Sequence, residues 1–206
     1  MSYTTEIDLL LQTYISEKIL PVYETYESSH DRSHIETVIR NSLELAKVHD
    51  VDINMVFTIA AYHDIGLPQG RENHEITSGR YLYEDKNLRH WFSEEEILLM
   101  KEAVEDHRAS RRERPRSIYG CIVAEADRDI KPERILERCA EYEKAHHSGS
   151  SREDVLKACV EHIHEKYGRN GYLKLWISSK RNEEGLEKIR SWIDDGSLSE
   201  RLSVYL

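Results

Sequence analysis

Apolar residues recur along the chain at the spacing of three to four residues that is typical of amphipathic helices. In residues 52–64, Ile53, Val56, Phe57 and Ala60 fall on one helical face. Glycine and proline are scarce, with 9 and 4 residues, and no Asn-Gly or Asp-Gly pair separates alternating apolar stretches. The pattern predicts an all-α protein, with helices over residues 5–20, 31–49, 52–64, 74–84, 93–107, 117–129, 132–147, 151–167 and 182–195.

Capping signals and helix breakers place several of these helix ends. Ser93 followed by Glu96 forms a capping box, and Pro132 suits the first position of a helix. Pro21 is expected to end the first helix, and the only candidate for an extended segment is Tyr172–Ser178. Because neither an internal repeat nor a low-complexity segment interrupts the pattern, we predict one helical domain over residues 1–206.

Composition and charge narrow the classes of function. Of the 206 residues, 39% are hydrophobic, which is enough for a core, and the formal net charge of -10 disfavours binding to polynucleotides and anionic membranes. The longest apolar run, Met55–Tyr62, is far shorter than the roughly 20 residues that span a bilayer. The acidic N-terminus lacks the pattern of an export signal. Cys121, Cys139 and Cys159 have no CxxC spacing, and we expect reduced thiols in a cytoplasmic protein.

His63 and Asp64 give the strongest sign of chemistry. They follow an apolar helix and project beside Val56 and Ala60, just before a turn at Gly66. A buried aspartate next to a buried histidine is costly unless both are paired or bind a cation. The alternative is a histidine that interacts with the helix dipole and an aspartate that is solvated.

Further metal-donor residues stand at the ends of other predicted helices. His34 lies near a helix start, where Asp31 is a candidate N-cap and His30 lies one turn upstream. Asp127 and Asp129 both stand at the C-terminal end of a predicted helix, where the helix dipole is negative. A cation or Arg128 would compensate for the carboxylate charge there, and the spacing does not show which of the two aspartates faces the site.

Two more histidines complete the set. His107 continues the buried row of its helix, and His74 opens a helix after a Gly/Pro loop. Each of these residues alone is a weak signal, and a core or capping role explains it as well. Together they form a nitrogen and oxygen donor set that suits Mn, Fe, Ni, Co, Zn or Mg.

The segments HDRSHIETV, IAAYHDIGLP and IVAEADRDI together resemble the HD superfamily of metal-dependent phosphohydrolases, over about residues 28–130. The resemblance implies a helical bundle around the metal, followed here by a C-terminal helical extension over about residues 131–206. It also implies one or two divalent ions per chain. One departure is Thr37, where many relatives have arginine. The metal donors implied by the resemblance are His34, His63, Asp64 and Asp127, with His74 and His107 for a second ion and Asp64 as a bridge.

The expected activity is cleavage of a phosphoester in a small molecule, with a nucleotide as one candidate. Asp64 or Asp129 would take up or orient protons, and His107 would protonate the leaving group if it is not a ligand. Phosphate recognition is expected from arginines, because their forks match phosphate oxygens. The candidates are Arg108, Arg111 and Arg112, within a run that also contains Arg114 and Arg116, and, separately, Arg71 in the Gly/Pro loop. The alternative for this run is a solvated loop that pairs with nearby carboxylates.

Two other functions stay open at this point. A few HD-type proteins hold two irons and activate oxygen, which would require both His74 and His107 as ligands. A sensor that binds metal or nucleotide without turnover is the third hypothesis. The apolar face with Leu186, Ile189 and Trp192 suits either a core or self-association into a homo-oligomer.

Overall fold

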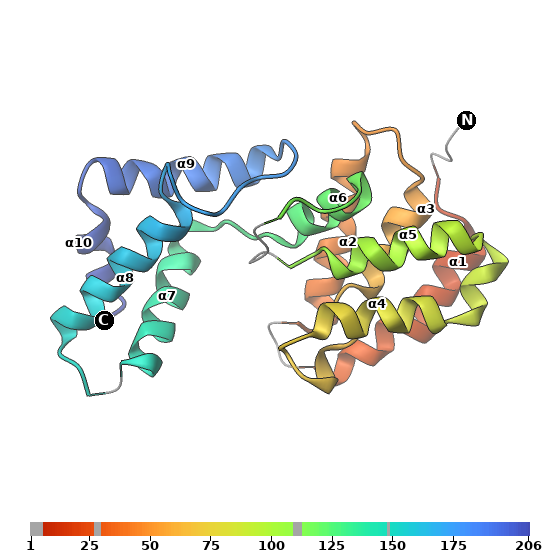
Figure 1. Cartoon of the computed structure of the whole chain (residues 1–206), viewed down its shortest axis with the longest axis horizontal. Coiled ribbons are helices and arrows are strands. Elements are labelled where there is room, and N and C mark those ends of the chain that lie inside the picture. The colour runs from red at the N-terminus through yellow and green to blue at the C-terminus, as the bar shows by residue number, and fades with distance from the viewer. Residues whose placement is uncertain (1–5, 27–29, 109–112, 148) are drawn as a thin grey trace. The chain divides into compact units, whose positions relative to one another are not determined.

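The computed structural model describes residues 6–26, 30–108, 113–147 and 149–206. The described residues form helices and no strand, which confirms the all-α prediction (Figure 1). The chain divides into two compact units, Met1–Arg128 and Asp129–Leu206, and the boundary falls near the start of the expected C-terminal extension. The α-helices are α1 (Leu9–Tyr14), α2 (Arg32–Ala46), α3 (Ile53–Tyr62), α4 (His74–Glu84), α5 (Glu94–Glu105), α6 (Ile118–Asp127), α7 (Pro132–His146), α8 (Arg152–Tyr167), α9 (Lys180–Asp194) and α10 (Leu198–Ser203).

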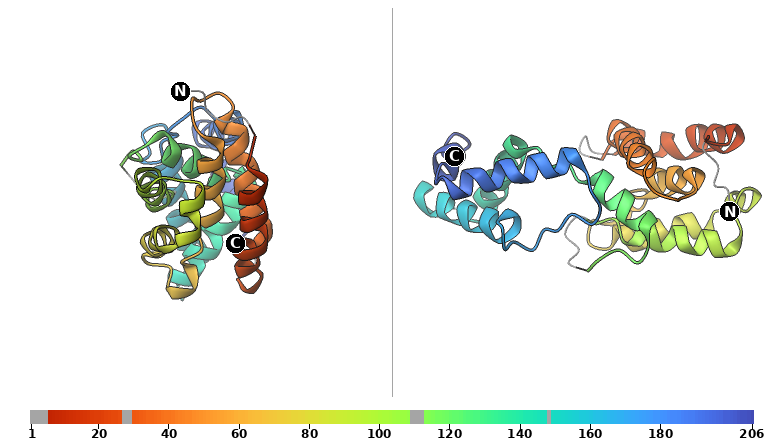
Figure 2. Two further views of the ribbon diagram at one scale, coloured as in Figure 1. Left: turned by 90° about the vertical axis from the view of Figure 1, so that its right-hand side faces the viewer. Right: turned by 90° about the horizontal axis from the view of Figure 1, so that it is seen from above.

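Helix α3 occupies the centre of the first unit. Every residue from Met55 to Tyr62 is buried, as expected for a helix that is apolar on all sides. Helices α2, α5 and α6 pack against it, and α4 lies along α5 (Figures 1 and 2). The residues that follow α3 therefore emerge in the middle of the bundle.

The N-terminal segment stays helical further than the sequence predicted. After α1 comes a π-helix over Ile15–Ile19 and then a 3₁₀-helix over Leu20–Thr25. The α- and π-helical part ends at Ile19, before Pro21 as predicted, but the 3₁₀-helix that follows was not predicted. Pro21 lies in the first turn of this 3₁₀-helix, where its missing N–H costs little. The Tyr23 hydroxyl donates to the carbonyl oxygen of Ala61 at 2.8 Å, and this bond ties the segment to the end of α3.

Local signals predicted most of the other helix ends. The capping box at Ser93 and Glu96 is present, and α4 covers the predicted residues 74–84. Short elements were missed, namely the 3₁₀-helices Leu67–Gln69 and Lys86–His90 and helix α10, because so few residues show no clear periodicity. Residues 172–178 form no strand.

Helices α7 to α10 form the second unit around a core of their own (Figure 2). Leu186, Ile189 and Trp192 are buried in this core, so the apolar face of α9 is used within the unit. A Cβ atom at Gly185 would lie 2.0 Å from the carbonyl oxygen of Ile130, so only glycine lets α9 approach the start of the unit this closely. Among the described residues, none of the helices is long and apolar enough to cross a bilayer.

Candidate metal centre

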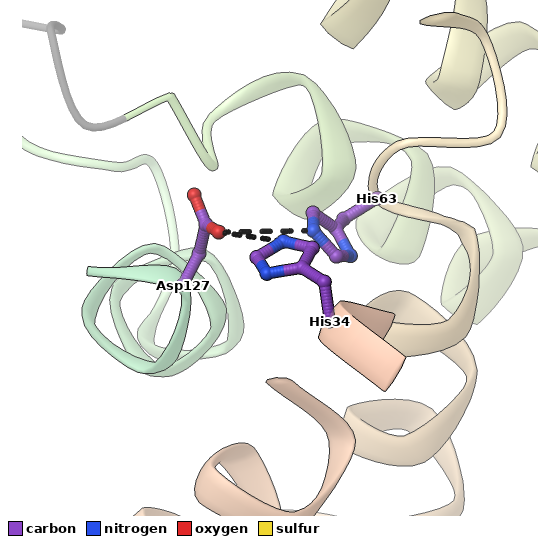
Figure 3. A group of neighbouring side chains, drawn as sticks. All are labelled: His34, His63 and Asp127. Carbon is purple, nitrogen blue, oxygen red and sulfur yellow. Dashed lines mark ion pairs between the residues drawn. The ribbon is translucent and has the colours of Figure 1, made fainter. Parts of the chain in front are cut away.

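Three helix ends of the first unit bring His34, His63 and Asp127 together (Figure 3). His34 lies in the first turn of α2, His63 caps the C-terminus of α3, and Asp127 is the last residue of α6. The Asp127 Oδ1 atom lies 3.2 Å from His34 Nε2 and 3.9 Å from His63 Nε2. Figure 3 shows the three side chains pointing toward one another, as the donors of one cation site would.

Asp64 connects this group to a second one that contains His74 and His107. Its Oδ2 atom lies 3.4 Å from His63 Nε2 and 3.8 Å from His34 Nε2. Its Oδ1 atom lies 3.2 Å from His74 Nε2 and 3.3 Å from His107 Nε2. Each carboxylate oxygen thus faces a different pair of imidazoles, which is the arrangement of a carboxylate that bridges two cations.

Backbone carbonyls fix the orientation of three of the imidazoles. The Nδ1 atoms of His63, His74 and His107 lie 2.8, 3.0 and 2.6 Å from the carbonyl oxygen of the residue three positions earlier. Because a carbonyl only accepts, each Nδ1 must carry the proton, and a neutral ring then presents the lone pair of Nε2 to the centre.

Two of the Nε2 atoms have no hydrogen-bond partner among the described residues. They belong to His34 and His63, and both atoms are buried. Such atoms are rare in folded proteins unless an ion or water satisfies them. Buried imidazole and carboxylate donors with unsatisfied nitrogens fit a divalent transition metal.

The electrostatics of the centre favour positive charge. Burial lowers the pKa of His63, but Asp64 and Asp127 outweigh it and raise the pKa to about 9. The pKa of His74 is also raised: burial lowers it, but the contact with Asp64 raises it. Burial raises the pKa of Asp64. The surrounding His63, His107 and His74 nevertheless hold that pKa well below its ordinary value. The pKa of Asp127 is lowered against burial by its contact with His34.

Comparison with known families agrees with this geometry. Residues 32–130 match the family model of the HD domain. The chain contains an HD domain. Proteins of the HD superfamily are mostly metal-dependent phosphohydrolases, and HD domains bind divalent metals. Searches of curated proteins and of solved structures find no match to the chain.

A close backbone contact positions the second half of the HD centre. The amide of Gly66 donates to the Ser78 hydroxyl at 2.9 Å, which joins the turn after Asp64 to α4. A Cβ atom at Gly66 would lie 2.6 Å from the Ser78 nitrogen and 2.7 Å from the His74 carbonyl oxygen. Only glycine therefore allows α4 to present His74 at this distance from Asp64.

Gly66→Ala is expected to move α4 and to weaken the site at His74. Overpacking of this kind costs about 1–3 kcal/mol in the free energy of unfolding. Metal analysis should show fewer ions per chain than in the unsubstituted protein, and urea unfolding should show the loss of stability. Glu72→Ala, at an exposed side chain of the same loop, is the matched control and should change neither. Full metal content in Gly66→Ala would contradict the positioning role.

Some arginines of the run after His107 pair with carboxylates, and others lie outside the described residues. The Arg116 amide donates to the fully buried Asp106 carboxylate at 2.7 Å, and its guanidinium lies 3.0 Å from that group. Arg116 thus fits the pairing alternative and holds the end of α5 beside His107. Arg108 lies 3.4 Å from the Glu75 carboxylate. Arg111 and Arg112 lie outside the described residues.

Asp129 has partners of its own in the second unit. Its carboxylate lies 3.0 Å from the Lys131 ammonium and 3.5 Å from the Arg134 guanidinium. The two donor groups of the HD centre include Asp127 and not Asp129. These ion pairs give Asp129 a structural explanation, so its proton-transfer role stays a prediction from the sequence alone.

A pocket of about 270 Å³ opens beside the metal donors. The ring of His30 lies 5.7 Å from that of His34, and an Arg71 guanidinium nitrogen lies 3.4 Å from His30 Nε2. Burial is the main cause of a lowered pKa at His30. The sequence pointed to Arg71 and His30 but missed the rest of the wall, because most of it comes from short 3₁₀-helices that show no clear periodicity. The pocket is lined by Thr25, Tyr26, His30, Leu67, Pro68 and Arg71.

Proposed function

We propose that the chain is a metal-dependent phosphohydrolase that acts on a small phosphorylated molecule. The observation that supports this most is the position of Asp64 between two sets of imidazoles. His34, His63, Asp64 and Asp127 would hold one divalent ion, and Asp64, His74 and His107 would hold a second. Bound divalent ions withdraw charge from phosphoryl oxygens and lower the pKa of coordinated water, which makes phosphoesters cleavable near neutral pH.

The chain's own part in this reaction is to hold its donors in fixed geometry and protonation. The Nδ1 bonds to backbone carbonyls keep three imidazoles oriented before substrate arrives, which removes a reorganisation cost. The lowered pKa keeps the Asp64 carboxylate ionised across the neutral range. His107 uses Nδ1 for a carbonyl and Nε2 for the centre, so we propose a ligand role for it in place of the proton-donor role.

The pocket beside His34 supports a small organic substrate. Leu67, Pro68 and the Tyr26 ring offer apolar walls, and Arg71 offers a cation for an anionic group. A volume of about 270 Å³ holds a small ring or short chain but no polymer segment. The net charge of -10 also opposes a polynucleotide.

Arg71→Ala is expected to raise KM for a phosphorylated substrate by about tenfold, the effect of losing about 1.4 kcal/mol of binding. The metal content should stay unchanged, because the Arg71 side chain belongs to the pocket and not to the donor groups. Steady-state kinetics with metal analysis of the same samples would measure both. Arg80→Ala, an exposed arginine on α4 that does not line the pocket, is the control. Unchanged KM in Arg71→Ala would remove Arg71 from the substrate site.

A phosphate-release screen tests the proposed activity. Purified protein would be incubated with nucleotides and sugar phosphates in the presence of Mn, Co, Ni or Mg. We expect release that a chelator abolishes and that added metal restores. Absence of release with every metal, together with retained binding of a nucleotide, would contradict the hydrolase and favour the sensor.

One observation also favours an oxidative alternative. His74 and His107 both face Asp64, and a di-iron HD-type oxygenase requires both as ligands. Iron that co-purifies at two ions per chain and absorbs visible light would support this alternative. Colourless protein that releases phosphate with Mn or Mg would exclude it.

A further inference from the structure

A third group of donor side chains lies in the second unit, where neither the HD match nor the sequence motifs assign a site. Cys139 and Glu143 stand four residues apart on α7 and therefore on one face. His147, four residues further, caps the end of α7, and His162 comes from α8. Two packed helices thus bring together a thiol, a carboxylate and an imidazole, and a second imidazole, that of His147, lies beside the carboxylate.

The donor atoms of this group are close enough for a shared ion. A thiol sulfur, a carboxylate oxygen and an imidazole nitrogen, from Cys139, Glu143 and His162, all lie within 4.8 Å of one another. The Glu143 carboxylate lies 2.7 Å from His162 Nδ1 and 3.2 Å from His147 Nε2. It contacts both imidazoles with separate oxygens, and its side chain is only 8% exposed.

Access from solvent is provided by the two histidines. The side chains of His147 and His162 are 47% and 32% exposed, whereas Cys139 and Glu143 are buried. The group therefore has a closed inner side formed by sulfur and carboxylate and an open side formed by imidazoles. An ion can enter on the open side and meet all donor types.

We propose that Cys139, Glu143 and His162 bind a divalent cation of the zinc class, with His147 as the fourth donor. Sulfur and imidazole ligands select zinc, cobalt or nickel over magnesium and calcium, which prefer oxygen. Four protein donors from two helices match the closed coordination of a structural site. This ion would join α7 to α8 and has no part in phosphoester cleavage.

The thiol is the donor that most needs an explanation. Its only hydrogen bond among the described residues is a weak one of 3.7 Å to the carbonyl oxygen of Cys159. A thiol binds a divalent cation as the thiolate, so its proton passes to solvent when the ion binds.

Cobalt absorption separates this site from the HD centre. Thiolate bound to Co²⁺ gives an intense near-ultraviolet charge-transfer band, whereas the HD centre offers only nitrogen and oxygen donors. Metal-free full-length protein would be titrated with CoCl₂ in the presence of a phosphine reductant. We expect the band to reach a plateau whose amplitude corresponds to one thiolate-bound Co²⁺ per chain, whatever further Co²⁺ the HD centre takes up. Phosphate release in Cys139→Ser should equal that of the unsubstituted protein.

Matched cysteine variants decide which thiol is involved. Cys139→Ser should abolish the band, while Cys121→Ser, in α6, and Cys159→Ser, in the same core, should keep it. If Cys139→Ser does not fold, His162→Ala tests the site at a partly exposed position and should weaken Co²⁺ binding at least about tenfold. Absence of the band in the unsubstituted protein, or a band unchanged in Cys139→Ser and in His162→Ala, would overturn the proposal.

Discussion

Asp64→Ala is expected to remove bound metal and phosphate release together. The substitution deletes both oxygens that face the two imidazole pairs and leaves the surrounding histidines without their counter-charge. Loss of a single donor to a developing charge already costs about 10²–10³-fold in kcat, and Asp64→Ala should cost more, since it deletes a whole ligand. Metal per chain, measured on the samples used for kinetics, gives both quantities.

Asp129→Ala is the control for this experiment. Its carboxylate pairs with Lys131 and Arg134, so its loss should leave the metal in place. The turnover of the same variant tests the proton-transfer role predicted from the sequence. Asp127→Ala, by contrast, should reduce metal content as Asp64→Ala does. Retained metal in Asp127→Ala together with loss in Asp129→Ala would reverse the assignment of the fourth donor.

Removal of the metal with a chelator is expected to make stability depend strongly on pH. In the metal-free fold the pKa of His63 is about 9, above its ordinary value, so the folded state binds more protons than the unfolded chain between about pH 6.5 and 9. The free energy of unfolding should therefore be largest below about pH 6.5 and fall by a few kcal/mol as the pH rises to about 9. Urea unfolding in EDTA at several pH values measures this slope.

The same series with metal provides the contrast. A bound cation takes the place of the protons, so the decline should shrink, and metal at one hundred times its Kd should add about 2.7 kcal/mol. The lowered pKa values of Asp64 and Asp127 act in the opposite direction, so their contribution is lost in acid. His90→Asn, at an exposed histidine, should keep the decline. Stability that rises from pH 6.5 to 9 without metal would contradict these pKa directions.

The sequence predicted which residues meet better than it predicted how they are held. Helical periodicity and the HD resemblance placed His34, His63 and His107 at helix ends, and there the structure brings them together. Periodicity did not distinguish Asp127 from Asp129, since each fits one apolar row. The fold does, because α6 ends at Asp127 and the next residues leave the helix.

Features that depend on short connecting segments or on contacts between helices could not be predicted from the sequence. The pocket wall at Tyr26 and Leu67 forms where the end of one short 3₁₀-helix meets the start of another, and such short elements follow from tertiary contacts. The Arg116 contact with Asp106 joins two residues that are ten positions apart in the sequence. The spacing of Cys139 and Glu143 was visible on one helix, but His162 becomes their neighbour only when α8 packs on α7.

The place where the chain divides has a consequence for how such a protein can diversify. All six donor residues of the HD centre precede Arg128, and the second unit begins at Asp129. A recombination event that joined a different C-terminal module at this junction would transfer all six candidate donors intact. Genetic exchange at this one point can therefore change what accompanies the HD domain without rebuilding its candidate metal centre.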